Sequence, residues 1–106
     1  MIKVIALLTK SPGMDRADFR RHWREAHGPL LMKIPTMRRY AQSHVVPDPS
    51  QPEPACDGVA EMWFDSVTAF QEALASPEGQ AGMADLPNFC DPTKLQIFYV
   101  EEVPFQ

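Results

Sequence analysis

The sequence predicts an α+β domain of ferredoxin-like type, with the order β-α-β-β-α-β and a four-stranded antiparallel sheet. Four short segments have the apolar or alternating patterns of strands, and amphipathic segments with helix caps lie after the first and after the third of them. A chain of 106 residues with 44% hydrophobic and 23% charged residues has the size and composition of one globular unit. We therefore expect residues 1–106 to form a single domain.

The first predicted strand covers residues 2–9, "IKVIALLT", which are apolar at both alternating positions. This pattern is typical of a central strand that is covered on both faces. The turn-forming sequence "KSPG" follows it, and Asp15 is then placed to cap a helix that begins at about Arg16.

The end of this helix is predicted from "HGPLL", residues 27–31. In a continuous helix the ring of Pro29 would clash with the carbonyl of Glu25, and a residue that precedes proline avoids the helical region. The sequence therefore predicts that the helix ends at His27 and that "PLLMKI" forms at most a short second turn.

Two further strands are predicted over residues 37–46 and 56–64, because both segments alternate in polarity. Between them lies "PDPSQPEP", residues 47–54, which we expect to be a long, irregular hairpin loop. The segment "DSVTAFQEALAS" predicts the second long helix, with Asp65 or Ser66 as its N-cap. Ser76-Pro77 predicts a new helix start, with Ser76 as cap and Pro77 at the first helical position. The last strand is predicted over residues 94–103.

Two helices cover only one side of such a sheet, so the sequence predicts an uncovered face. Alternation in the third strand places small and apolar side chains toward the helices and Glu61 and Trp63 on the opposite side. We expect Tyr40 and His44, which share one parity of the second strand, to lie on that same uncovered face.

An apolar sheet face gains about 25 cal/mol for each Å² of apolar surface that it buries. We therefore expect a homodimer that forms through the sheet faces and encloses a chamber for a small hydrophobic molecule. The formal net charge of −4 argues against nucleic acid as a partner. No apolar run approaches the roughly 20 residues of a membrane span, and we expect a cytoplasmic protein.

The chain contains two cysteines, Cys56 and Cys90, without CxxC spacing or neighbouring histidines. This arrangement favours free thiols over a disulfide framework, and it predicts no metal site.

The segment "FRRHWREAHGPLLMKIP" resembles the signature of EthD-domain proteins, in which a helix with the pattern F-x-x-x-W-x-x-x-H-x-P-L follows the first strand. The later segment "AEMWFDSVTAFQEALASPEG" is similar to the third strand and second helix of that family, so the resemblance extends over nearly the whole chain. The residues that match the helix pattern are Phe19, Trp23, His27, Pro29 and Leu30.

The resemblance implies a dimeric α+β barrel, in which two ferredoxin-like protomers pair through their sheets. Proteins of this architecture include polyketide cyclases and dehydratases, muconolactone isomerases, cofactor-free oxygenases and haem-degrading enzymes. The founding EthD is associated with ethyl tert-butyl ether degradation, which supplies no chemical role to transfer. His27 and Trp23 are the matching positions implied as a family site, and residues 47–54 are where we expect this chain to depart from its relatives.

His27 is the preferred acid or base, because an imidazole exchanges protons efficiently near neutral pH. The alternative is a structural His27 that stabilises the C-terminus of its helix. His44 and Glu61 are expected to assist His27 in catalysis. The alternative for both, and for Tyr40, is a polar network at the dimer interface.

Tyr40, Trp63 and Trp23 are the predicted substrate-binding residues, although the position of Trp23 in the apolar stripe also predicts a core residue. Asp57 and Tyr99 are weaker candidates. His22 and His27 are predicted on the two shoulders of the apolar stripe of the helix. They are five residues apart, which is not the four-residue spacing that would present two metal ligands side by side.

The leading functional hypothesis is a cofactor-independent enzyme that performs proton-transfer chemistry (cyclisation, dehydration or isomerisation) on a hydrophobic, oxygenated small molecule. One alternative is a haem-binding or haem-degrading barrel with an axial His27 or His44. The other is a non-catalytic accessory protein that binds a small molecule.

Overall fold

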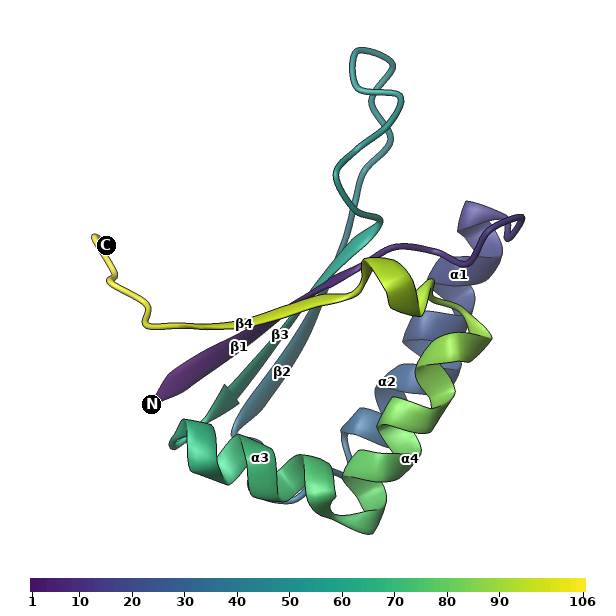
Figure 1. Ribbon diagram of the computed structural model, residues 1–106. Coiled ribbons are helices and arrows are strands. Elements are labelled where there is room, and N and C mark those ends of the chain that lie inside the picture. Colours follow the sequence, from purple (N-terminus) through teal and green to yellow (C-terminus); the bar gives the residue numbers. More distant parts are fainter.

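The computed structural model describes residues 1–106 and has the predicted α+β ferredoxin-like fold (Figure 1). Its four-stranded sheet is antiparallel throughout and has the strand order β2-β3-β1-β4, so β1 is central as predicted. The strands are β1 (Ile2–Leu8), β2 (Arg39–His44), β3 (Gly58–Phe64) and β4 (Gln96–Val100).

All helices lie on one side of the sheet (Figure 1). The predicted caps are confirmed, because Asp15 accepts a hydrogen bond from the Ala17 N–H, and Ser66 and Ser76 accept hydrogen bonds in the first turns of α3 and α4. The helices are α1 (Arg16–His22), the π-helix η1 (Trp23–His27), α2 (Gly28–Leu31), α3 (Val67–Ala75) and α4 (Pro77–Asp85), followed by the 3₁₀ turns η2 (Leu86–Asn88) and η3 (Pro92–Lys94).

The predicted helix end at His27 is wrong. The Gly28 N–H donates to the carbonyl of Trp23, five residues earlier, and the chain continues into α2 with Gly28 in helical geometry. A π turn is wider than an α turn. The wider turn relieves the contact that an α-helical Pro29 would make with the carbonyl of Glu25, so the proline changes the helix type instead of ending the helix.

The strand register corrects one prediction about the sheet faces. Tyr40 pairs with Met62 and His44 with Gly58, and paired residues of an antiparallel sheet share a face. Because Met62 and Gly58 are buried toward the helices, Tyr40 and His44 also face the helices and not the uncovered side. Glu61 does lie on the uncovered face, as predicted.

The core lies between the sheet and the helices, and the indole of Trp23 is its largest fully buried side chain. It packs on the ring of Phe19, with ring centroids 5.7 Å apart. A Cβ atom at residue 58 would overlap the six-membered ring of Trp23, so Gly58 is required for this close approach of η1 to β3.

The segment between β2 and β3 stands away from the sheet as the predicted hairpin loop, and the residues after β4 also extend from the domain (Figure 1). No helix has both the length and the apolar character to span a bilayer.

The substitution Gly58→Ala should lower the free energy of unfolding by about 1–3 kcal/mol, because the added methyl group displaces the indole of Trp23. Urea unfolding of Gly58→Ala measures this loss. In a Trp23→Phe background, which lacks the overlapping ring atoms, the same change should lower the free energy of unfolding less. Equal losses in both backgrounds would show that the indole does not restrict residue 58.

Candidate functional site

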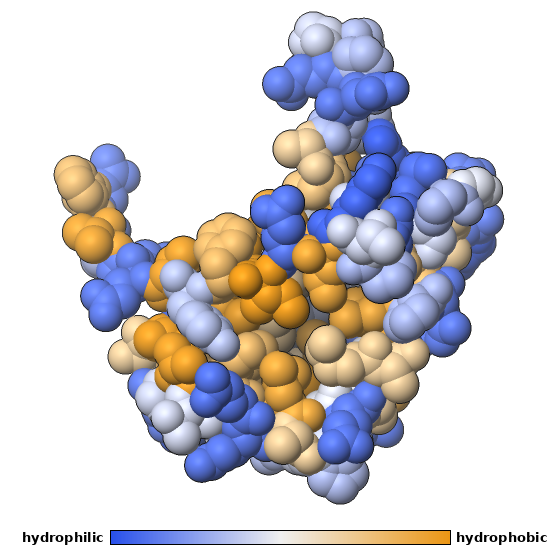
Figure 2. All heavy atoms as spheres, in the orientation of Figure 1, coloured by the Kyte–Doolittle hydropathy of each residue, from blue (hydrophilic) through white to orange (hydrophobic).

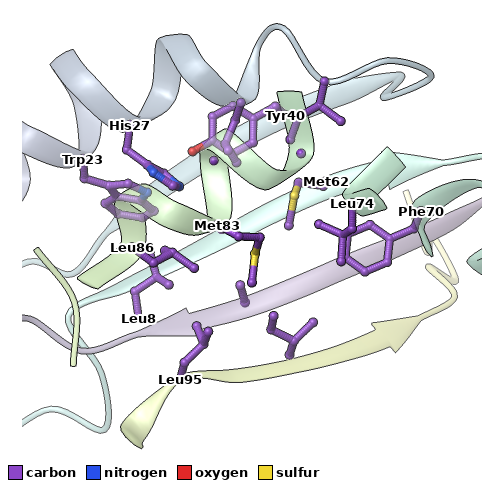
Figure 3. A pocket seen from close by; sticks show the side chains of 17 residues that line it. Leu8, Trp23, His27, Tyr40, Met62, Phe70, Leu74, Met83, Leu86 and Leu95 are labelled. Atoms are coloured by element: carbon purple, nitrogen blue, oxygen red, sulfur yellow. The ribbon is translucent and has the colours of Figure 1, made fainter. Parts of the chain in front are cut away.

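An apolar cavity of about 50 Å³ lies between the sheet and the helices. It opens into the hydrophobic hollow visible at the centre of Figure 2, and 14 of its 17 lining residues are hydrophobic. The polar groups on its wall belong to His27, Tyr40 and Trp23 (Figure 3). The sequence predicted a chamber enclosed by two subunits at the opposite face of the sheet. This cavity lies within one protomer on the helix side, and the chamber between subunits stays a prediction.

The π turn brings His22 and His27 to the same side of the helix, although an α-helix would separate residues five apart. His22 Nε2 lies 3.0 Å from each carboxylate oxygen of Asp85, and His27 Nδ1 lies 2.9 Å from Asp85 Oδ2. The prediction that the two histidines lie apart is therefore wrong, because it assumed a regular α-helix.

Asp85 is the site residue that the sequence analysis missed. It is the last residue of α4, and Asn88 Nδ2 donates a 3.0 Å hydrogen bond to its Oδ1. The ring of Phe89 packs against both imidazoles, with centroid distances of 4.8 Å to His22 and 4.9 Å to His27. The segment "ADLPNF" carries no motif that would have marked this aspartate.

His27 is only 3% exposed, and burial lowers the pKa of its imidazole even though the hydrogen bond to Asp85 opposes that shift. Burial by itself would raise the pKa of Asp85, but hydrogen bonds from Asn88, His22 and His27 lower it overall. A neutral imidazole beside an ionised carboxylate donates its Nδ1–H to that carboxylate. The unprotonated Nε2 of His27 forms no hydrogen bond within the chain and is available to the cavity.

Three side chains of β2 form a hydrogen-bonded row that ends at the cavity. His44 Nε2 lies 2.9 Å from Gln42 Oε1, and Gln42 Nε2 donates to Tyr40 Oη at 2.8 Å and to the Trp23 carbonyl at 2.9 Å. The imidazole of His44 packs on the indole of Trp23, with centroids 4.4 Å apart, and does not line the cavity. His44 is therefore placed behind Trp23, where it supports the orientation of Gln42.

Glu61 and Trp63 lie on the opposite face of the sheet, so the structure does not bring them together with His27. The carboxylate of Glu61 forms a 2.9 Å ion pair with Lys3. The ring of Trp63 lies under the Lys3 ammonium at 5.0 Å and the Arg39 guanidinium at 4.6 Å.

The weaker candidates and the cysteines lie outside the cavity wall. Asp57 accepts hydrogen bonds from the Lys10 N–H and from Arg16, which fastens the start of β3. Tyr99 faces the helices and packs edge-on against Phe70. Both cysteines are free, and burial raises the pKa of the Cys90 thiol to about 12. No group of three His, Cys, Asp or Glu side chains is arranged to hold a metal ion.

The free energy of unfolding should fall as the pH drops below about 6.5, the ordinary pKa of histidine. Unfolded His27 binds a proton in that range, whereas folded His27, with its lowered pKa, binds one only at lower pH. Urea unfolding between pH 7.5 and 5 should show a shallower pH dependence for His27→Gln than for the unsubstituted chain. The half-buried His44, whose pKa is also lowered by burial, accounts for part of the dependence that remains. Identical slopes would contradict a neutral His27.

The model of the EthD domain family matches residues 11–93. An uncharacterised 11.0 kDa protein from the thcB-thcC intergenic region of Rhodococcus erythropolis is 34% identical over 88 residues, which are 83% of this chain and 84% of that protein. The crystal structure of an ethyl tert-butyl ether d (EthD) family protein from Bacillus halodurans C-125 has a TM-score of 0.80 and 31% identity over 97% of this chain and 99% of that one.

Two more distant structures share the fold alone. A dimeric ferredoxin-like protein of unknown function from Bacteroides fragilis has a TM-score of 0.72 and 16% identity over 95% of each chain. SnoaB, a cofactor-independent oxygenase from Streptomyces nogalater, has a TM-score of 0.64 and 14% identity over 95% of this chain and 91% of its own. With a family model that covers most of its length and a structural relative above 30% identity, this chain belongs to the EthD domain family.

Proposed function

We propose that this EthD protein is a cofactor-independent enzyme that moves a proton on a hydrophobic, oxygenated small molecule, in a cyclisation, dehydration or isomerisation. One observation carries the proposal. The Nε2 of His27 is an unpaired base at the wall of an apolar cavity, and Asp85 holds the opposite nitrogen of the ring at 2.9 Å. Because burial lowers the pKa of His27, its imidazole stays unprotonated at neutral pH and can accept a proton.

Asp85 has the role of a positioning residue. Its carboxylate fixes the tautomer of His27 and stabilises the imidazolium that forms when Nε2 takes up a proton. His22 Nε2 and Asn88 Nδ2 also contact this carboxylate, each at 3.0 Å from its Oδ1. SnoaB, a cofactor-independent oxygenase, shares only the fold with this chain. Its activity supports the idea that this fold can carry out chemistry without a bound cofactor.

Haem binding is less well supported by the cavity. A porphyrin beside His27 would need a slot far larger than about 50 Å³, a space that holds only a few water molecules. We therefore retain the proton-transfer function. Of the catalytic residues predicted from sequence, His27 keeps a direct role, His44 becomes a supporting residue, and Glu61 is assigned to the opposite face.

The substitution His27→Gln should reduce protein-dependent hydrogen–deuterium exchange next to the carbonyl of cyclic aryl ketones by about 100-fold or more, since it removes the base. Exchange in D₂O is followed by NMR and compared with the buffer rate. The matched control is His22→Gln, which alters the other contact of Asp85 but leaves the cavity wall unchanged, and it should retain most of the exchange. Full exchange by His27→Gln would remove this residue from the mechanism.

We also propose that the chain forms a homodimer through its uncovered sheet face. That face carries apolar side chains on all four strands, among them Ile5, Val59 and Phe98, and Phe98 is 43% exposed. The existence of dimeric ferredoxin-like proteins with the same fold supports this arrangement.

Light scattering should give twice the chain mass of 12.0 kDa for the unsubstituted protein. The substitution Phe98→Asp should shift this mass toward that of the monomer, because it places a carboxylate in the buried contact. Met32→Asp, which changes a more exposed apolar residue on the helix side, should leave the dimer intact. A monomeric unsubstituted protein at micromolar concentration would contradict the proposal.

A further inference from the structure

The cavity wall contains a buried hydrogen-bond donor that has no acceptor. Trp23 is fully buried, and its indole Nε1 makes no hydrogen bond. Buried polar groups are almost always paired, so an orphaned donor on a cavity wall indicates a partner that the cavity receives. The indole N–H lies close enough to Tyr40 Oη to lower the pKa of that hydroxyl, yet it does not reach it with hydrogen-bond geometry.

Tyr40 supplies a second free donor. The oxygen of Tyr40 already accepts a hydrogen bond from Gln42 Nε2. If the amide group of Gln42 turned over to accept from Tyr40, it would lose its hydrogen bond to the Trp23 carbonyl. The hydroxyl hydrogen of Tyr40 therefore has no acceptor in the chain. Burial raises the pKa of Tyr40 overall, which keeps this hydrogen in place near neutral pH.

These two donors and the base occupy one end of the cavity. In Figure 3 the indole nitrogen of Trp23, the hydroxyl of Tyr40 and the imidazole of His27 are turned toward the same region, and apolar side chains make up the rest of the wall. A cavity end without polar groups would bind a hydrocarbon in any orientation. Two donors beside a base instead select a molecule with an oxygen acceptor next to a removable proton.

We propose that this end of the cavity binds the carbonyl oxygen of an enolisable ketone, with the N–H of Trp23 and the O–H of Tyr40 donating to that oxygen. The chemical step in this inference rests on the proposed function, whereas binding of the carbonyl oxygen does not depend on it. His27 Nε2 takes the proton from the carbon next to the carbonyl, and the electron pair of the broken C–H bond moves to the oxygen. The two donors stabilise the resulting enolate. His27 returns a proton to the same or another carbon, so no oxidant or further reactant is needed. Exchange of the proton on His27 with solvent before that return gives the deuterium uptake that the exchange test measures.

The space around the donors limits the shape of the ketone. A cavity of about 50 Å³ admits only the reacting end of a ligand. The cavity wall includes Met83 and Ile97, each 40% exposed. Apolar side chains also surround the hollow into which the cavity opens (Figure 2). An apolar ring system attached to the carbonyl carbon would cover these side chains, so the substrate class is a ketone with a hydrophobic body.

The test compares 2-tetralone with tetralin, which has the same ring skeleton without the oxygen, by ¹H–¹⁵N NMR of the indole signals. We expect 2-tetralone to move the Trp23 indole proton downfield and tetralin to leave it in place. Trp63 lies on the opposite face and serves as an internal control. Tyr40→Phe should weaken 2-tetralone binding about tenfold without changing the binding of tetralin. Tyr99→Phe, which removes the chain's other phenol outside the cavity wall, should change neither.

Equal affinity for the two probes, a shift at Trp63 instead of Trp23, or no binding of 2-tetralone at millimolar concentration would overturn the inference. Hydrogen–deuterium exchange at the carbon next to the carbonyl distinguishes a failure of this inference from a failure of the proposed function. A Trp23 shift without exchange would support the oxygen site and contradict the proton-transfer function. His27-dependent exchange without a Trp23 shift would support that function and contradict the oxygen site.

Discussion

The hydrogen bond from the Gly28 N–H to the Trp23 carbonyl, five residues back, is the constraint on which the site depends. An α-helix turns by about 100° per residue, so it would direct His22 and His27 to different sides. The π turn adds a residue and brings both imidazoles against one carboxylate. Gln42 donates to the same Trp23 carbonyl, which links the turn to β2 and to the hydroxyl of Tyr40. One widened turn therefore sets the positions of the base, its aspartate and a cavity donor.

Small residues at helix contacts determine how close the helices come to the sheet. Gly58 admits the indole of Trp23 against β3, and Gly82 admits the side chain of Leu31 against α4. The helices do not extend over β4 to the same degree, since Ile97 and Tyr99 face the helix side but remain 40% and 45% exposed. Tight packing over the centre and open packing over one edge leave a cavity that is closed around His27 and open toward β4 (Figure 2).

The sequence predicted the fold more fully than the site, and the reason is the range of the interactions involved. Caps at Asp15, Ser66 and Ser76 are local contacts, as is the alternation along each strand, so the element order followed from sequence neighbours. Asp85 reaches His22 across 63 positions of the chain and His27 across 58, and no local pattern reports such a contact. The wrong helix end at His27 came from a local feature, Pro29. It arose because only an α-helix was considered, and a π turn accommodates the proline.

The sequence by itself determined the strands, the helices and the apolar side of each, since the periods of two and of 3.6 residues are properties of the backbone. It also determined the EthD pattern that includes Trp23 and His27. Only the tertiary structure decided which face of the sheet Tyr40 and His44 occupy, because alternation separates two faces without saying which of them the helices cover. The register that pairs Tyr40 with Met62 settled that choice, and it placed Tyr40 at the same cavity as His27.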